Sequence, residues 1–323
     1  MLDLPDMGNI RDAARRIRGE AVRTPLLRSA YLDGLVGGRV FLKAENLQRT
    51  GSFKFRGAFN ALAAYGARAR NGVVACSSGN HAQGVAEAAA IHDVRATIVM
   101  PSDAPRAKVE RTRRAGAHVI HYQRFVEDRT VIAKGIAERD GSVFVHPFED
   151  PHVIAGQGTC GLEIAEQLQE HGAEPDAVLV CAGGGGLAAG ISLALRDAFP
   201  SCAVHLVEPE GFDDQRRSLE TGERIAIEPN RSSVCDAIVT EMPGERPFAI
   251  LRGHASGVTV SDGEALKAVA FAFNELKVVI EPGGAVALAA VLFNKVDARD
   301  RTLVATLSGG NIDAAMLQRA LDG

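Results

Sequence analysis

The chain has 323 residues, a length that suits two domains or one large α/β unit. Apolar residues make up 46% and charged residues 24%, which is ordinary for a globular enzyme. The net charge of −4 leaves no basic surplus to meet phosphates, which argues against a nucleic-acid partner. No apolar run approaches the roughly 20 residues that span a bilayer, so no membrane partner is expected.

The cytoplasm is the compartment expected from the sequence. The stretch from Met1 to Glu20 is charged and carries no secretory apolar core. The five cysteines are scattered and flanked mostly by small residues. This pattern indicates reduced, buried thiols and favours neither a disulfide framework nor a zinc site.

The N-terminal part mixes helical and extended segments. Apolar spacing predicts a helix over residues 9–18, which Asn9 can cap. Pro25 fixes an extended segment at residues 23–26. Residues 39–43 alternate like a strand, and a helical pattern follows over residues 53–66.

From Val73 to Val207, short β-rich runs alternate with helical segments. This alternation predicts parallel sheet with helices on both faces. Ligands of such sheets bind at the carboxyl ends of the strands. The expected strands cover residues 73–76, 96–100, 118–121, 143–146, 177–181 and 203–207, and the expected helices cover residues 81–92, 105–115, 126–139, 157–170 and 187–199.

The C-terminal part continues the same pattern. Helices are expected over residues 263–276 and 283–293, followed by a strand over 302–307, a glycine turn and a last helix. The segment 221–257 is the least regular part of the chain, and we expect it to be rich in loops.

A single lysine, Lys54, stands between Phe53 and Phe55. Aromatic neighbours desolvate an amine, which disfavours the ammonium form and leaves a nucleophile. Such a lysine can form a Schiff base with an aldehyde cofactor. On this stretch alone, a surface lysine lying over two core rings is the commoner outcome.

Small polar residues follow the strand expected at 73–76. The run from Ser77 to Gly84 lies where this strand passes into a helix, so several backbone N–H groups face outward at a helix N-terminus. That arrangement is a natural carboxylate site, and Asn80 can also donate to a phenolic oxygen. An ordinary helix cap is the alternative, but a cap needs only one such residue.

Four successive glycines, Gly183 to Gly186, precede Leu187 and the helix expected there. Their entropic cost is explained by a phosphate that approaches the backbone N–H groups and the helix dipole. The pattern matches neither the dinucleotide nor the triphosphate fingerprint. Ser308, at the end of the strand expected at 302–307, can donate to a ring nitrogen, although a helix cap at Asn311 explains that stretch equally well.

These four stretches, in this order, resemble the second fold type of pyridoxal-phosphate enzymes, specifically the threonine dehydratase and serine racemase group. The resemblance runs from Arg23-Thr24-Pro25-Leu26 to Ser308-Gly309-Gly310-Asn311. It implies an α/β fold of two domains, each a mostly parallel twisted sheet flanked by helices, as in the tryptophan synthase β fold. Residues 1–45 and 146–323 would form a large cofactor-binding domain, and residues 46–145 a small mobile one.

The resemblance also implies the role of each site residue. Lys54 would hold the cofactor covalently and move the α-proton, and Ser78 would act on the opposite ring face. Glu281 would lie near the ring, and Ser308 would bond its nitrogen. The implied cofactor-binding residues are Phe53, Lys54, Asn80, Gly183, Gly184, Gly185, Gly186, Leu187, Glu281 and Ser308, and the implied substrate residues are Ser77, Ser78, Asn80, His81 and Arg129.

The acidic turn after residue 207 matches a Mg²⁺ or Mn²⁺ site of the serine racemase group. The implied ligands are the carboxylates of Glu208 and Asp214 and the carbonyl of Phe212. Hard cations favour such oxygen donors, with waters completing the shell. A solvated acidic turn is the alternative.

The reaction implied by the resemblance is loss of water from a 3-hydroxy amino acid, most simply L-threonine or L-serine, giving a 2-oxo acid and ammonia. Phe148 replaces an asparagine of serine racemase and Ala237 a glycine of many relatives, and both changes favour a dehydratase. A 3-hydroxyaspartate dehydratase, a serine racemase with side elimination, a β-replacement synthase and a non-catalytic ligand-binding protein remain alternatives. The expected partners are a small amino-acid substrate and a second copy of the chain.

Overall fold

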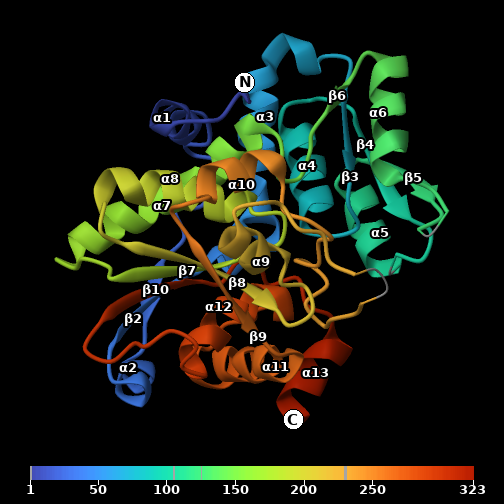
Figure 1. The fold of residues 1–323 in the computed structure, drawn as a ribbon. Coiled ribbons are helices and arrows are strands. Elements are labelled where there is room, and N and C mark those ends of the chain that lie inside the picture. Colours follow the sequence, from blue (N-terminus) through green and yellow to red (C-terminus); the bar gives the residue numbers. More distant parts are fainter. Residues whose placement is uncertain (1, 105, 125, 229–230) are drawn as a thin grey trace.

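The computed structural model describes residues 2–104, 106–124, 126–228 and 231–323, and it contains two separate sheets (Figure 1). The six-stranded sheet has the order β1-β2-β10-β7-β8-β9, and only β1 runs antiparallel to its neighbour. Its strands are β1 (Leu26–Arg28), β2 (Arg39–Lys43), β7 (Ala177–Cys181), β8 (Ala203–Pro209), β9 (Ser256–Val260) and β10 (Thr302–Thr306).

The four-stranded sheet has the order β5-β4-β3-β6 and is entirely parallel. Its strands are β3 (Val73–Cys76), β4 (Ala96–Pro101), β5 (His118–Tyr122) and β6 (Val143–Phe144). The alternating run expected between residues 73 and 207 is therefore divided between both sheets. Helices α3 (Lys54–Tyr65), α4 (Asn80–Ile91), α5 (Arg106–Arg114) and α6 (Arg129–Asp140) surround the smaller sheet.

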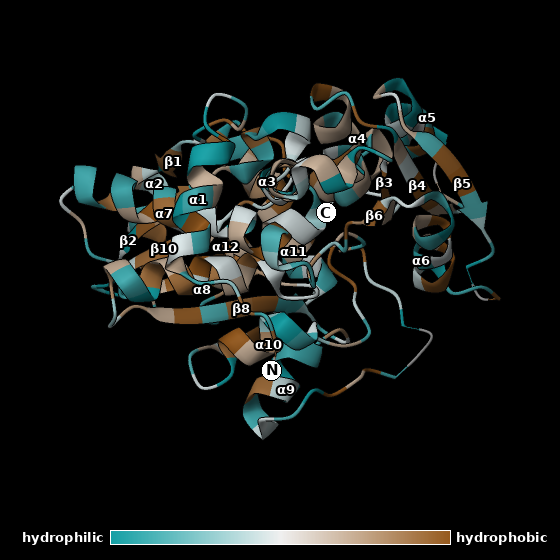
Figure 2. Cartoon of the chain, turned by 90° about the horizontal axis from the view of Figure 1, so that it is seen from above, coloured by the Kyte–Doolittle hydropathy of each residue, from teal (hydrophilic) through white to brown (hydrophobic). Residues whose placement is uncertain are grey.

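Alternate residues of each buried strand face opposite layers of helices. In β7, Val178 and Val180 pack with α7 and α8, while Leu179 and Cys181 pack with α11 and α12. Figure 2 shows hydrophobic strand segments such as β8 inside and a hydrophilic α5 outside. The helices around the larger sheet are α1 (Met7–Arg16), α2 (Ala30–Val36), α7 (Pro151–Glu170), α8 (Gly186–Ala198), α9 (Asp214–Thr221), α10 (Glu245–Leu251), α11 (Asp262–Phe271), α12 (Pro282–Leu292) and α13 (Ala314–Asp322).

Helix α3, which begins at Lys54, is anchored by the fully buried Arg56. Its guanidinium bonds Glu45 at 2.8 Å from Nε to Oε2, and Glu163 at 2.7 Å from Nη1 to Oε1. A buried cation is tolerated when such partners satisfy its donors. The start of α3 is therefore tied to α7 and to the segment after β2.

Several boundaries differ from the sequence expectation. Helix α7 begins at Pro151 and not at residue 157, because Asp150 accepts from the backbone N–H groups of His152 and Val153 and proline suits the first helical turn. The segment expected to be rich in loops, 221–257, contains α10. The helix expected over 263–276 ends as a π-turn over Ala272–Leu276. The helix expected over 105–115 starts at Arg106 in the structure, and residue 105 lies outside the described residues.

The fold class expected from the sequence is confirmed. Both sheets are mostly or wholly parallel and are flanked by helices. Within the described ranges, none of the helices combines the length and apolar character that crossing a bilayer requires.

Candidate active site

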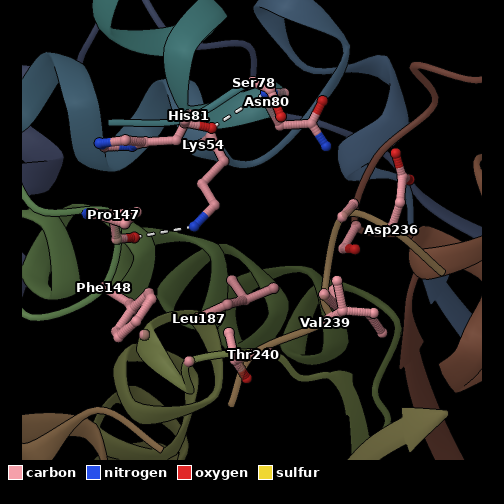
Figure 3. Close-up of a pocket in the computed structure, with 18 of the residues that line it drawn as sticks. Lys54, Ser78, Asn80, His81, Pro147, Phe148, Leu187, Asp236, Val239 and Thr240 are labelled. Atoms are coloured by element: carbon pink, nitrogen blue, oxygen red, sulfur yellow. Dashed lines mark hydrogen bonds between the residues drawn. The ribbon is translucent and has the colours of Figure 1, made fainter. Parts of the chain in front are cut away.

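One pocket gathers every residue that the sequence assigned to a cofactor or a substrate. Figure 3 shows part of its lining, including Lys54, Ser78, Asn80, His81 and Leu187. The residues come from loops that follow β3, β7 and β10 and from the starts of α3, α6 and α12. Carboxyl ends of parallel strands form binding sites in this way. The assigned residues that line the pocket are Phe53, Lys54, Ser77, Ser78, Asn80, His81, Arg129, Gly183, Gly184, Gly185, Gly186, Leu187, Glu281 and Ser308.

The Lys54 amine points across the pocket and donates to the Pro147 carbonyl at 2.9 Å from Nζ to O (Figure 3). It lies 5.0 Å from the centre of the Phe53 ring. The second aromatic neighbour, Phe55, is fully buried in the core on another face of α3. Desolvation by burial lowers the pKa of Lys54 from 10.5 to about 8.

His81 supports the segment that holds this lysine. Its Nε2 lies 3.0 Å from the Val145 carbonyl, two residues before Pro147. Burial, with the Lys54 charge nearby, lowers the pKa of His81 to about 3. The imidazole is therefore neutral at physiological pH, and Nε2 must carry the proton that it donates to the carbonyl.

The glycine loop forms an anion cradle at the N-terminus of α8. Within the described residues, the backbone N–H groups from Gly183 to Leu187 have no acceptor in the protein. Gly185 has a φ of 90°, a left-handed conformation that favours glycine. Free N–H groups and the positive end of a helix dipole together fit a phosphate group.

A network of amides and a carboxyl group forms another wall. Asn80 Nδ2 donates to Glu281 Oε1 at 2.5 Å, and Asn80 Oδ1 accepts from Asn311 Nδ2 at 2.7 Å. Burial raises the pKa of Glu281 to about 7, against the opposing effect of the Asn80 hydrogen bond. Ser308, 4% exposed, lies at the end of β10 and lines the same pocket.

The residues expected to bind a metal lie outside this pocket. Glu208 accepts from the backbone N–H groups of Gln215 and Arg216, both at 2.9 Å. Asp214 Oδ2 lies 3.4 Å from Thr240 Oγ1, and its buried Oδ1 has no partner within the described residues. Burial and the neighbouring Asp214 raise the pKa of Glu208, and burial raises the pKa of Asp214 to about 7. No group of three or more His, Cys, Asp or Glu side chains suited to a metal occurs in the described ranges.

Sequence reasoning missed an ion pair beside the pocket. Lys108 of α5 bonds Asp236 at 2.8 Å from Nζ to Oδ2, and both line the pocket. Lys108 is one of several cations on α5, and nothing in the local pattern distinguishes it. Asn311, which the sequence offered only as a helix cap, also lines the pocket. The remaining unassigned lining residues include Pro147, Phe148, Ala237, Ile238, Val239 and Thr240.

The fold and this pocket define a pyridoxal-phosphate enzyme of the second fold type. The family model described as pyridoxal-phosphate dependent enzyme matches residues 17–309. Because the match covers most of the chain, the protein belongs to this family, and pyridoxal phosphate is its cofactor. The amine of Lys54 and the free N–H groups of the glycine loop suit the aldehyde and phosphate of that cofactor.

The relatives are similar over the whole chain. L-threo-3-hydroxyaspartate ammonia-lyase of Pseudomonas sp is 42% identical over 324 residues, covering 100% of both chains. L-threonine ammonia-lyase of Thermotoga maritima is 42% identical over 324 residues, covering 100% of this chain and 79% of that protein. Among solved structures, the threonine deaminase of T.th. has a TM-score of 0.90 at 45% identity, covering 96% of this chain and 99% of that one.

The rate at which the cofactor-free protein captures pyridoxal phosphate is expected to rise with pH through a midpoint near 8. Only the uncharged amine attacks an aldehyde, and burial lowers the pKa of Lys54 to about 8. The native state binds fewer protons here than the unfolded chain, so this group makes stability rise with pH from about 8 towards 10.5. Stopped-flow absorbance measures the capture. A capture rate that keeps rising tenfold per pH unit above about pH 9 would show that the Lys54 amine has the pKa of an ordinary lysine.

Proposed function

We propose that the protein is a dehydratase that removes water from a 3-hydroxy amino acid, with L-threonine or L-serine as the first choice of substrate. The products are a 2-oxo acid and ammonia. One observation carries the proposal: a lysine amine with a pKa of about 8 shares a pocket with a free anion cradle and a loop of backbone N–H groups. The ammonia-lyase names of two relatives that match the whole of this chain support it.

The Ser77 to His81 loop is proposed to bind the substrate carboxylate. The N–H groups of Asn80 and His81 lie at the N-terminus of α4 and have no acceptor within the described residues. The helix dipole adds to their attraction for an anion. Ser78 belongs to the same loop and lines the pocket. A substrate held there would share the pocket with the Lys54 amine.

Lys54 is proposed to act as the base. When bound, pyridoxal phosphate supplies an electron sink that acidifies the α-proton of the amino acid. The released Lys54 amine takes this proton, and the Pro147 carbonyl orients the amine by accepting its hydrogen bond. Ser308 lines the pocket and would offer the ring nitrogen of a bound cofactor a neutral hydroxyl. A neutral partner would leave the cofactor a milder electron sink than a carboxylate partner would, which would favour prompt loss of the leaving group.

A substrate panel tests the proposal. The purified protein, loaded with pyridoxal phosphate, is offered L-serine, L-threonine, D-serine and the 3-hydroxyaspartate isomers. We expect 2-oxo acid and ammonia from L-serine or L-threonine. Racemised product without 2-oxo acid would mean that the protein is a racemase and not a dehydratase. No turnover of any of these compounds would also contradict the proposal.

A 3-hydroxyaspartate dehydratase is the second candidate, and Arg129 favours it. This residue begins α6 and lines the pocket, and no ion pair joins it to an acid within the described residues. Lys108 is another cation that lines the pocket, but its amine is already paired with Asp236. A second substrate carboxylate would therefore find its partner in Arg129.

We also propose that Glu208 and Asp214 hold a divalent cation together with the Phe212 carbonyl. Two buried carboxylates whose pKa values are raised repel each other, and Asp214 Oδ1 is buried without a partner in the described part of the chain. A hard cation with waters in its shell would relieve both conditions.

Removal of divalent cations by a chelator is expected to lower the melting temperature by about 2–6 °C, because a cation bound only by the native state stabilises it. Glu208→Gln is expected to abolish the gain in melting temperature on adding back Mg²⁺ or Mn²⁺. Glu210, an exposed acid of the same turn, provides the control variant Glu210→Gln, which should keep that gain. A melting temperature that is indifferent to chelator and to added cation would identify the turn as a solvated loop.

The division into residues 1–45 with 146–323 and residues 46–145 stays a prediction, which the two separate sheets support. The homodimer and the cytoplasmic location also stay predictions. Light scattering of the purified protein would test the dimer.

A further inference from the structure

A fully buried glutamine lies behind the anion cradle. Gln215 is 0% exposed and belongs to the first turn of α9. Its Nε2 donates to the Gly183 carbonyl at 2.6 Å. Gln215 is not among the residues that line the pocket, so it contacts the cradle from the protein side.

The hydrogen bond from Gln215 to the Gly183 carbonyl also sets the direction of the Gly184 N–H. In a trans peptide, the C=O of one residue and the N–H of the next point in opposite directions. The Gly183 carbonyl is held toward Gln215, so the Gly184 N–H must point away from Gln215. Gly184 lines the pocket, and its N–H has no acceptor within the described residues.

The peptide between Gly184 and Gly185 is also held by a hydrogen bond, and Gln215 packs against Gly185. The Gly184 carbonyl accepts from the Gly244 N–H at 3.1 Å, which turns the Gly185 N–H to the opposite side. A Cβ at Gly185 would lie 2.9 Å from Gln215 Nε2, and Gly185 has a φ of 90°. Gln215 therefore orients the peptide between Gly183 and Gly184 and packs against Gly185, where the left-handed φ favours glycine.

The Gln215 side chain is oriented for this one contact. Its backbone N–H donates to Glu208 Oε1 at 2.9 Å, which fixes the first turn of α9. Its amide oxygen, Oε1, is buried without a partner in the described ranges. Turning the amide over would place that oxygen against the Gly183 carbonyl, so the nitrogen must face the cradle. A buried amide oxygen left unbonded is unfavourable, and such groups in native structures call for a specific explanation.

We propose that Gln215 is a positioning residue for the cofactor phosphate: its amide holds the Gly183 carbonyl away from the pocket and thereby aims the Gly184 N–H at the phosphate. The proposal rests on the cofactor and is independent of which amino acid the enzyme consumes. Gln215 acts only through the glycine backbone. Its replacement should therefore change how the phosphate is held while leaving the covalent attachment at Lys54 possible.

The test replaces Gln215 with methionine, which has a similar length and no donor, and in parallel with alanine, which adds no bulk. The dissociation constant of pyridoxal phosphate is measured on cofactor-free protein, and we expect it to rise about 10-fold or more in both variants. The phosphorus NMR resonance is then recorded after borohydride reduction has fixed the cofactor to Lys54. Once unbound cofactor is washed away, every cofactor molecule in that sample is attached to Lys54, so a changed resonance reports the environment of the phosphate and not the loss of cofactor.

Gln167→Met is the matched control. Gln167 is also buried, and its Nε2 donates to a backbone carbonyl, that of Thr24, at 2.9 Å, away from the pocket. It should lower the melting temperature while leaving the dissociation constant and the phosphorus resonance unchanged. The proposal is overturned if both Gln215 variants bind pyridoxal phosphate within about twofold of the wild type with an unchanged resonance, or if Gln167→Met weakens binding as much.

Discussion

Lys54→Ala is expected to lower the rate of 2-oxo acid formation by at least about 10³-fold. General acid–base catalysis by a positioned side chain contributes roughly 10²–10⁴-fold, and this substitution also removes the covalent anchor of the cofactor. The amine lies over the Phe53 ring with the Pro147 carbonyl as its acceptor, and no other lysine amine is placed in this way among the described residues. The rate is measured with L-serine and L-threonine, and the visible absorbance reports the attached cofactor.

The fold is expected to survive this substitution. Burial lowers the pKa of Lys54, so the folded protein holds its ammonium form at a cost, which alanine removes. The loss of one hydrogen bond to Pro147 offsets part of that gain. Lys54→Arg keeps the cation but has no nucleophilic amine, and it should lose activity as fully as alanine does. Turnover near the wild-type rate in either variant, at an unchanged melting temperature, would remove Lys54 from the mechanism.

The site could be found from the sequence where its residues lie next to one another in the chain. Strands β3 and β7 begin and end where their short apolar runs do, and the polar or glycine-rich residues after them form the loop and the cradle. Both signals are local, because a strand end and the helix start that follows it share a few residues. Local signals could not divide the strands between the two sheets, because β6 and β7 follow each other in sequence but belong to different sheets.

Contacts between distant segments could not be read from the sequence. Lys108 reaches Asp236 across 128 residues, and Gln215 reaches Gly183 across 32. Neither side chain differs from its neighbours in any local pattern, and each gains its role only when two sheets or two loops come together. Phe55 shows the converse. Its place beside Lys54 in sequence suggested contact with the amine, but consecutive helical residues point about 100° apart, and Phe55 faces the core.

The choice between substrates depends on Arg129. Threonine and serine present one carboxylate, for which the Ser77 to His81 loop is available. Hydroxyaspartate presents a second, and burying it without a partner would be unfavourable. Arg129 lines the pocket from the first turn of α6 and can bond a carboxylate through two N–H groups at once. Lys108 is a weaker candidate because its amine is already bonded to Asp236.

If the enzyme consumes 3-hydroxyaspartate, Arg129→Ala is expected to lower kcat/KM on that substrate by on the order of 30- to 1000-fold. This loss corresponds to roughly 2–4 kcal/mol, because the substitution removes a charge-assisted hydrogen bond and leaves the substrate carboxylate unpaired. The turnover of serine should be spared, because serine has no second carboxylate. Arg129→Lys keeps the charge without the planar fork and should fall between the wild type and alanine. Lys134, an exposed cation of the same helix that does not line the pocket, supplies the control Lys134→Ala, which should leave both substrates unaffected. If Arg129→Ala leaves the kcat/KM of both hydroxyaspartate and serine near the wild-type values, the guanidinium meets solvent and not a second carboxylate, and L-threonine or L-serine would then stand as the substrate.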